Sequence, residues 1–248
     1  MSRPKKFSHY NADKIQSELI EAVVESYEET GELKITANEF NLSPLKIRKI
    51  LITAGVYQNK VSDEVNELYK QGKTTQQIME ITGLKKSSVN GYLPYSKIIY
   101  KSDIVSRNAV RIQVYRNRKA AIELLHNKPD ENILWSAIIA FQGYPFHTYS
   151  GIPFLYNIPM EKKGIYSKEV SVVCKNKREN LTWSHILWAY KKIHKSKENI
   201  IEKPDVIAAI QENSYIYPIF YRLGLIDVPE KIAKRMELKR LRKRGTME

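Results

Sequence analysis

Two segments of the chain share one pattern of short helical run, turn and second short helical run. Their turn residues, Asn41 and Gly83, are 42 positions apart. Glycine and asparagine most readily adopt the left-handed backbone conformation that a tight turn between helices demands. Apolar residues at helical spacing flank both turns, so each pair of helices can pack together. The pattern predicts an internal duplication of structure within residues 33–97, with weak sequence identity between the copies.

Local signals at the chain's turns set the expected helix ends. Ser43 and Pro44 predict a helix start, because serine caps helices and proline fits the first helical position. This helix is expected to continue to about Ala54. A helix over residues 62–71 precedes the second unit, whose last helix is expected to stop at Pro94.

The N-terminal part of the chain predicts an acidic helix over residues 11–30. Asn11 can cap this helix and Gly31 can end it. It has six acidic residues and one basic residue, in a chain whose net charge is +14. We therefore expect its surface to face away from phosphate.

The charge of the remaining chain points to a polyanionic partner. The chain has 41 Lys and Arg residues against 27 Asp and Glu residues, which favours nucleic acid first and an anionic membrane surface second. Seven bases and one acid lie between residues 97 and 119, at the start of a long helix expected over 103–127. The arm 1–10 and the tail 230–244 are also basic.

The C-terminal half has a different character. An apolar run near residues 133–144 predicts a buried helix, and residues 152–158 and 169–175 predict two strands. Residues 175–180 are expected to be a turn, and a helix capped by Thr182 follows. Further apolar helices are expected before a basic tail.

These segments predict a mainly α-helical protein with a small β-hairpin in its C-terminal half, an α+β class. The expected domains are 1–60 with the acidic helix and first turn-centred unit, 61–100 with the second unit, 101–128 as a basic linker helix, 129–229 as an α+β domain and 230–248 as a basic tail helix.

The second turn-centred unit, TTQQIMEITGLKKSSVNGY, resembles the resolvase and sigma-factor style of helix-turn-helix. Its expected buried set is Ile78, Leu84, Val89 and Tyr92. It departs from the family at Met79, where such motifs usually keep alanine. The first unit resembles the same motif, with Ala37 at the small position. The resemblance covers residues 33–97 and implies a tandem helix-turn-helix region joined by the basic helix to the C-terminal domain.

The resemblance implies that the second helix of each unit meets DNA. The residues expected to contact DNA are Lys46, Arg48, Lys49, Lys85, Lys86, Ser87, Ser88 and Asn90, with Arg107 and Arg111 following the backbone. The amide of Asn90 can pair bidentately with adenine. Two such units would span consecutive major-groove segments about 10 bp apart.

The expected function is sequence-specific binding of double-stranded DNA by a bacterial or phage transcriptional regulator. We expect the C-terminal half to sense a ligand, dimerise into a homodimer or add DNA contacts, the last through a basic wing at Lys175, Lys177 and Arg178. A third hypothesis is a protein-interaction module whose bases serve solubility.

No catalytic, metal-binding or cofactor-binding residues are predicted. The single cysteine, Cys174, excludes an intrachain disulfide, and His185 and His194 are too far apart in sequence for the zinc spacing of a helix. The alternative function is a DNA-acting enzyme, such as a restriction or mobile-element nuclease, or its targeting subunit. Its site would lie around Glu161 and Glu169.

The expected location is the cytoplasm. No stretch of the sequence approaches the roughly 20 apolar residues of a membrane span. A lone cysteine is typical of a reducing compartment. We therefore expect no membrane partner.

Overall fold

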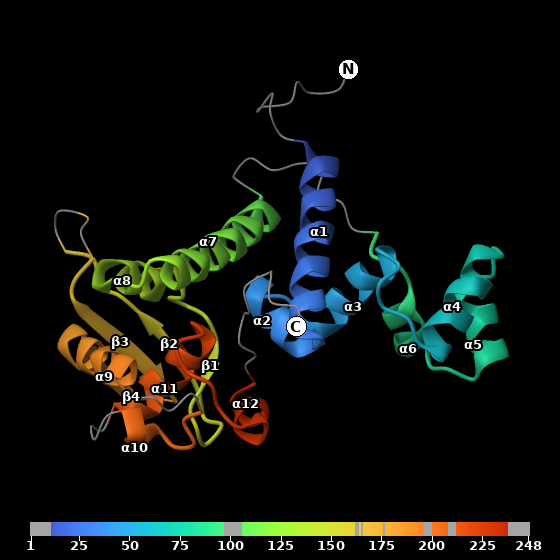
Figure 1. The fold of residues 1–248 in the computed structure, drawn as a ribbon. Coiled ribbons are helices and arrows are strands. Elements are labelled where there is room, and N and C mark those ends of the chain that lie inside the picture. Colours follow the sequence, from blue (N-terminus) through green and yellow to red (C-terminus); the bar gives the residue numbers. More distant parts are fainter. Residues whose placement is uncertain are drawn as a thin grey trace. The chain divides into compact units, whose positions relative to one another are not determined.

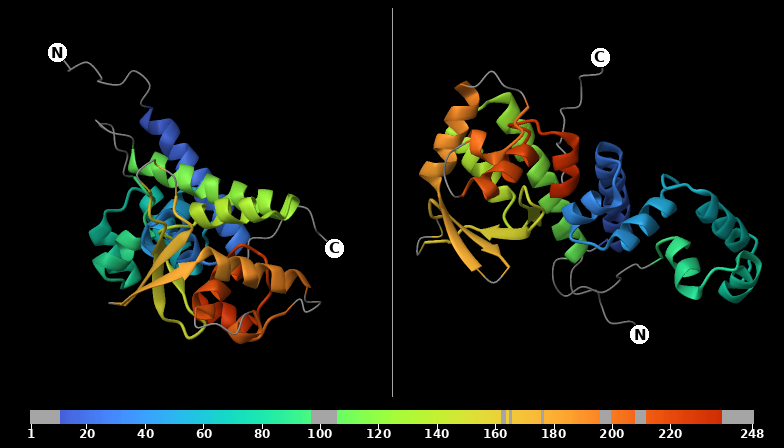
Figure 2. Two further views of the ribbon diagram at one scale, coloured as in Figure 1. Left: turned by 90° about the vertical axis from the view of Figure 1, so that its left-hand side faces the viewer. Right: turned by 90° about the horizontal axis from the view of Figure 1, so that it is seen from below.

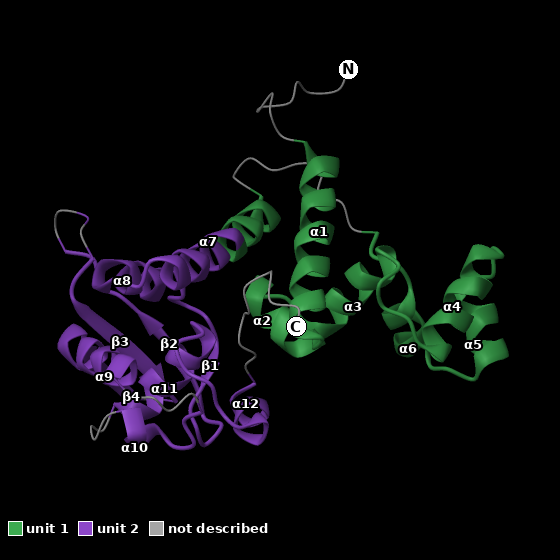
Figure 3. Cartoon of the chain, in the orientation of Figure 1, with its two compact units in different colours: residues 1–115 green, residues 116–248 purple. Residues whose placement is uncertain are grey.

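The computed structural model describes residues 11–96, 106–161, 164, 166–175, 177–195, 200–207 and 212–237. The chain divides into two compact units, residues 1–115 and residues 116–248 (Figure 3). The division falls inside one helix, within the segment expected to be a separate linker. The predicted arm 1–10, the start of the long helix at 103 and most of the tail lie outside the described residues. No described helix is long and apolar enough to cross a membrane.

The described part of unit 1 is helical (Figure 1). Its helices are α1 (Ala12–Thr30), α2 (Leu33–Phe40), α3 (Pro44–Thr53), α4 (Lys60–Lys70), α5 (Thr75–Thr82), α6 (Lys86–Tyr92) and the first half of α7 (Arg107–Asn127). Helices α1, α2 and α3 pack around one buried cluster, and α4, α5 and α6 pack around a second.

The helix ends follow the capping signals of the sequence. The Asn11 side chain accepts a hydrogen bond from the backbone N–H of Lys14 (2.9 Å), and Ser43 caps α3 in the same way. Asn41 and Gly83 are both left-handed, with φ of 48° and 69°. Helix α4 starts two residues earlier than predicted, because Asn59 caps it by accepting the N–H of the third helical residue (2.8 Å).

Unit 2 contains a four-stranded antiparallel sheet in the order β1-β2-β3-β4, and helices pack against one of its faces. Its elements are the second half of α7, α8 (Glu131–Ala140), β1 (Phe146–His147), β2 (Pro153–Asn157), β3 (Glu169–Cys174), β4 (Lys177–Thr182), α9 (Trp183–Lys195), α10 (Pro204–Ile207), α11 (Asn213–Arg222) and α12 (Glu230–Met236). The protein is thus mainly helical with a small sheet in its C-terminal half, which confirms the predicted class.

Residues 175–180 were predicted as a turn, and this prediction is wrong. The strand β4 starts at Lys177, which pairs with Cys174 of β3, so residues 177–180 belong to a strand. The segment is polar because its strand lies at the edge of the sheet, where half of its side chains are exposed. The helix expected after it is present as α9, and Thr182 accepts a hydrogen bond from the N–H of His185 (3.4 Å).

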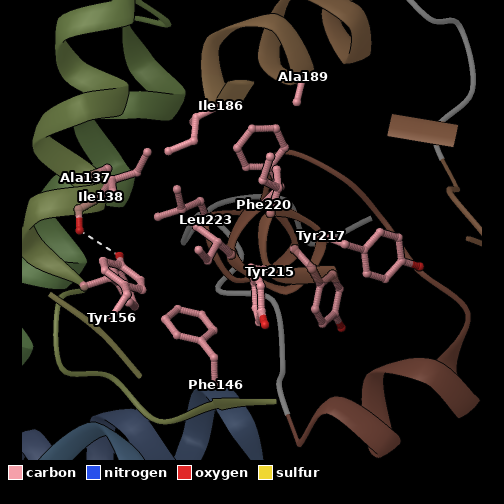
Figure 4. Packing of buried hydrophobic residues seen from close by; sticks show 14 of the residues in the cluster. Ala137, Ile138, Phe146, Tyr156, Ile186, Ala189, Tyr215, Tyr217, Phe220 and Leu223 are labelled. Atoms are coloured by element: carbon pink, nitrogen blue, oxygen red, sulfur yellow. Dashed lines mark hydrogen bonds between the residues drawn. The ribbon is translucent and has the colours of Figure 1, made fainter. Parts of the chain in front are cut away.

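One face of the sheet carries the core of unit 2. Phe146 and Tyr156 point from β1 and β2 toward α8, α9 and α11 (Figure 4). The Phe154 ring of β2 lies 5.0 Å from the Tyr215 ring of α11. The Tyr156 hydroxyl donates a hydrogen bond to the carbonyl oxygen of Ile138 in α8 (2.7 Å). Burial raises the pKa of Tyr156, so this phenol stays a protonated donor.

Candidate nucleic-acid interface

Helix α6 is held by a compact cluster beneath it. Val65, Ile78 and Val89 come from α4, α5 and α6 and are fully buried. Met79, the position at which the family resemblance departs, packs half-buried against this cluster. A capping box between Thr74 and the helix residue three positions later fixes the start of α5. The small core therefore orients α6 through its inner face.

Helix α6 and its N-cap residue carry half of the ten residues predicted to contact DNA. Lys85, Lys86, Ser87 and Asn90 are exposed, whereas Ser88 is half-buried. Among the described residues, neither lysine side chain forms an ion pair. The face thus presents two cationic groups and one amide to solvent.

The three basic residues of α3 that were predicted to contact DNA are less exposed than the lysines at the start of α6. Lys46, Arg48 and Lys49 are half-buried, and they contact α6 or the residues just after it. The Arg48 Nε donates to the Gly91 carbonyl oxygen (3.2 Å), and the Lys49 Nζ donates to the Asn90 carbonyl oxygen (3.0 Å). Cations are favoured there because the last carbonyls of a helix lack intrahelical partners.

Aromatic rings complete this contact between α3 and α6. The guanidinium carbon of Arg48 lies 4.3 Å from the centre of the Tyr92 ring, and the Lys46 Nζ lies 5.2 Å from that of Tyr95. Gly91 is buried at the contact, where an added Cβ would lie 2.6 Å from an Arg48 nitrogen. The glycine therefore allows the guanidinium to reach the end of α6.

Direct contact between α3 and α6 corrects the expected spacing of the two units. Helices in successive major-groove segments on one face of DNA lie about 34 Å apart. Side chains of α3 instead bond the backbone of α6 directly. The two helices therefore form one continuous surface.

The predicted backbone contacts on α7 lie one helical turn apart. Arg107 is exposed, and Arg111 is half-buried and donates to the Asn108 side chain (3.2 Å). Burial lowers the pKa of Arg111, and the nearby charge of Arg107 lowers it further. Arginine remains cationic at neutral pH in spite of such shifts.

Arg48→Lys tests the contact between α3 and α6. It keeps the charge but removes the planar group over Tyr92 and the Nε donor. We expect the free energy of unfolding of unit 1 to fall by about 0.5–1 kcal/mol, measured by hydrogen exchange of the α6 amides. The same change in a Tyr92→Leu background should add little, and Arg107→Lys is the exposed control. Equal losses in both backgrounds would contradict the stacking.

The carboxylates considered for a nuclease are partly brought together. Glu161 and Glu169 line one open pocket, which also contains Lys168. Lys175 lies at the opposite end of β3 from Glu169. The described residues hold no group of three or more metal-ligating side chains.

The histidines named in the sequence have separate partners. His185 lies 3.5 Å from a carboxylate oxygen of Glu212, and the His194 ring packs against Tyr190 at 4.2 Å between centres. These contacts do not bring the two rings to one site.

Tyr92 and Gly91 belong to the contact between α3 and α6, although the sequence predicted only a buried role for Tyr92 and none for Gly91. The signal in the sequence was a glycine directly before an aromatic residue at the end of a short helix.

Comparisons with models of protein families, with curated proteins and with solved structures find no match. Function is therefore inferred from geometry and charge.

Proposed function

We propose that the protein binds double-stranded DNA sequence-specifically, with α6 as the reading helix. The observation that carries this proposal is the exposed face of α6. It places Lys85, Lys86 and Asn90 outward on a helix that follows a left-handed turn and is fixed by a core beneath it. Lysines supply affinity for phosphate, and the amide can read adenine. Such a protein would serve as a transcriptional regulator, as the helix-turn-helix resemblance implies.

In this proposal α3 has a supporting role. Arg48 and Lys49 bind the carbonyls at the end of α6 and so fix its direction. Their charges also raise the positive potential beside the reading face. The exposed Arg107 adds a charge on α7 for the DNA backbone.

A selection of random duplexes against the purified full-length protein tests this function. At about 150 mM salt, non-specific binding is weak and a defined motif must come from base reading. We expect one enriched motif, because α3 and α6 share one surface. A pool without enrichment contradicts the proposal.

Asn90→Ala is expected to lower affinity for the selected motif by about 1–3 kcal/mol and to relax preference at one base. The Asn90 amide would otherwise pair bidentately with that base. Competition binding on single-base variants of the motif measures both effects. Asn132→Ala removes an exposed amide from α8 in unit 2 and is the matched control. Equal weakening on every sequence would make Asn90 a backbone contact.

A second candidate function, cleavage of DNA, rests on the pocket that Glu161 and Glu169 share. Carboxylate oxygens are the ligands that Mg²⁺ prefers. Incubating the selected DNA with protein and magnesium tests it. Cut ends that disappear with Glu161→Gln or Glu169→Gln would make the protein a nuclease, and intact DNA would leave it a binder.

A further inference from the structure

The sheet of unit 2 has a second face, opposite the core. Along β2 and β3 buried side chains alternate with more exposed ones. Helices α9 and α11 lie to one side of the strands (Figure 2), and side chains from both belong to the core cluster. Leu155, whose neighbours along β2 are buried, is 43% exposed. This face is called the open face below.

Strand register places the open-face residues in two rows. Leu155 pairs with Val173, which pairs with Arg178. Asn157 pairs with Ser171, which pairs with Asn180. Paired side chains on one face lie about 5 Å apart, and the rows are about 7 Å apart. The face therefore holds an arginine, two amides, a hydroxyl and two aliphatic groups in a small grid.

The stability of the sheet does not explain these residue types. Asparagine is depleted in strands, where threonine and valine fit better. Both Asn157 and Asn180 are exposed, and within the described part of the chain their side chains have no hydrogen bond or ion pair. Their amides are free to bind something outside the chain.

Charge complementarity favours a polyanion as the ligand of this face. Arg178 lies on the open face next to the hairpin between β3 and β4, and the exposed Lys175 follows β3 directly. Lys177 is exposed too, but it lies on the other side of β4. The acidic Glu169 lies at the far end of β3. Glu179 is half-buried and shares the core side of the sheet with its partner Val172. One end of the open face is thus cationic.

We propose that the open face binds the major groove of double-stranded DNA. Three neighbouring strands span about 10 Å, and the major groove is about 12 Å wide. Sheets are known to read DNA in this groove. Arginine suits guanine, asparagine suits adenine, and aliphatic groups suit the thymine methyl. The rows are about two base steps apart, because the rise per base pair is about 3.4 Å.

This surface belongs to unit 2, so the protein has two DNA-reading surfaces on one chain. The inference goes beyond the proposed function of α6 and concerns other residues. It identifies what the C-terminal half contributes, namely a second set of base contacts at positions of the selected motif that α6 does not read.

The double variant Asn157→Thr/Asn180→Thr is the main test, in the full-length protein. Threonine favours strands, so we expect the melting temperature to stay equal or rise. Affinity for the selected DNA should fall about tenfold or more, since each bidentate amide–adenine pair discriminates by that order. Arg178→Ala should weaken binding similarly. Asn132→Ala and Lys195→Ala remove an exposed amide and an exposed charge from helices and are the controls.

The outcomes separate this inference from the proposed function. Relaxed preference at bases other than those read by Asn90 supports the inference. Wild-type binding by the sheet variants, with Asn90→Ala impaired, overturns the inference and keeps the function. Impaired sheet variants with a normal Asn90→Ala support the sheet and overturn the role of α6. Equal weakening on all sequences overturns base reading by the sheet, and no DNA binding at all overturns both.

Discussion

Phe146→Ala is expected to lower the free energy of unfolding of unit 2 by about 3–5 kcal/mol. The side chain is fully buried, and its ring centre lies 4.8 Å from that of Tyr144, 5.5 Å from Phe154 and 5.8 Å from Tyr156. Alanine would leave a cavity between these rings and remove the stacking on Phe154 and Tyr156 and the edge-on contact with Tyr144. The loss is a large share of the 5–15 kcal/mol that folded domains usually have.

Tryptophan fluorescence during urea unfolding measures this loss selectively. The three tryptophans of the chain, Trp135, Trp183 and Trp188, all lie in unit 2. Met160→Ala is the control, because Met160 is 62% exposed. It should change stability by no more than about 0.5 kcal/mol. A Phe146→Ala protein as stable as this control would contradict the packing.

Ile78→Ala is expected to cost about 2–5 kcal/mol and to unfold α4, α5 and α6 locally. Ile78 is one of three fully buried residues in their cluster, so little remains to hold the helices. Amide exchange should become fast in residues 60–92 and stay slow in α1. Binding to the selected motif should fall to the level of random DNA, because α6 loses its support.

Ile81→Ala provides a matched control on the same helix. Ile81 lies three residues further along α5 and is 54% exposed. The same atoms are removed in both variants, so a difference in their stability arises from the burial of Ile78. Exchange in residues 60–92 that stays slow in Ile78→Ala would show that other contacts hold α6.

Most helices could be predicted because their ends carry local signals. Asn11, Ser43 and Gly83 act through their own backbone or through residues a few positions away. A short stretch of sequence therefore contains everything that determines where these helices begin and end. Strand β4 could not be predicted in this way. Leu181 is its one fully buried residue, and it comes next to last, after a run of charged and amide side chains.

The sequence predicted the candidate site correctly where the only question was which side chains of a helix are exposed to solvent. Lys85, Lys86 and Asn90 are exposed as the helical period indicates. Arg48 and Lys49 show the opposite case. Helix carbonyls and phosphates both offer oxygens to a cation, so the sequence alone does not distinguish an arginine that binds DNA from one that caps a neighbouring helix.

Arg48 and Lys49 donate hydrogen bonds to carbonyls near the end of α6, and this contact also limits which fragments of the chain can keep the structure of α6. A fragment with only α4, α5 and α6 would lose the hydrogen bonds and the ring stacking that α3 supplies. Grafted onto another scaffold, it would carry Lys85, Lys86 and Asn90 on a helix whose end is unsupported. The portable element is therefore the whole of unit 1. It includes Tyr95, whose backbone N–H donates to the Thr53 hydroxyl (2.7 Å), and the first half of α7, whose Ile112 and Tyr115 are buried in the cluster of α1, α2 and α3.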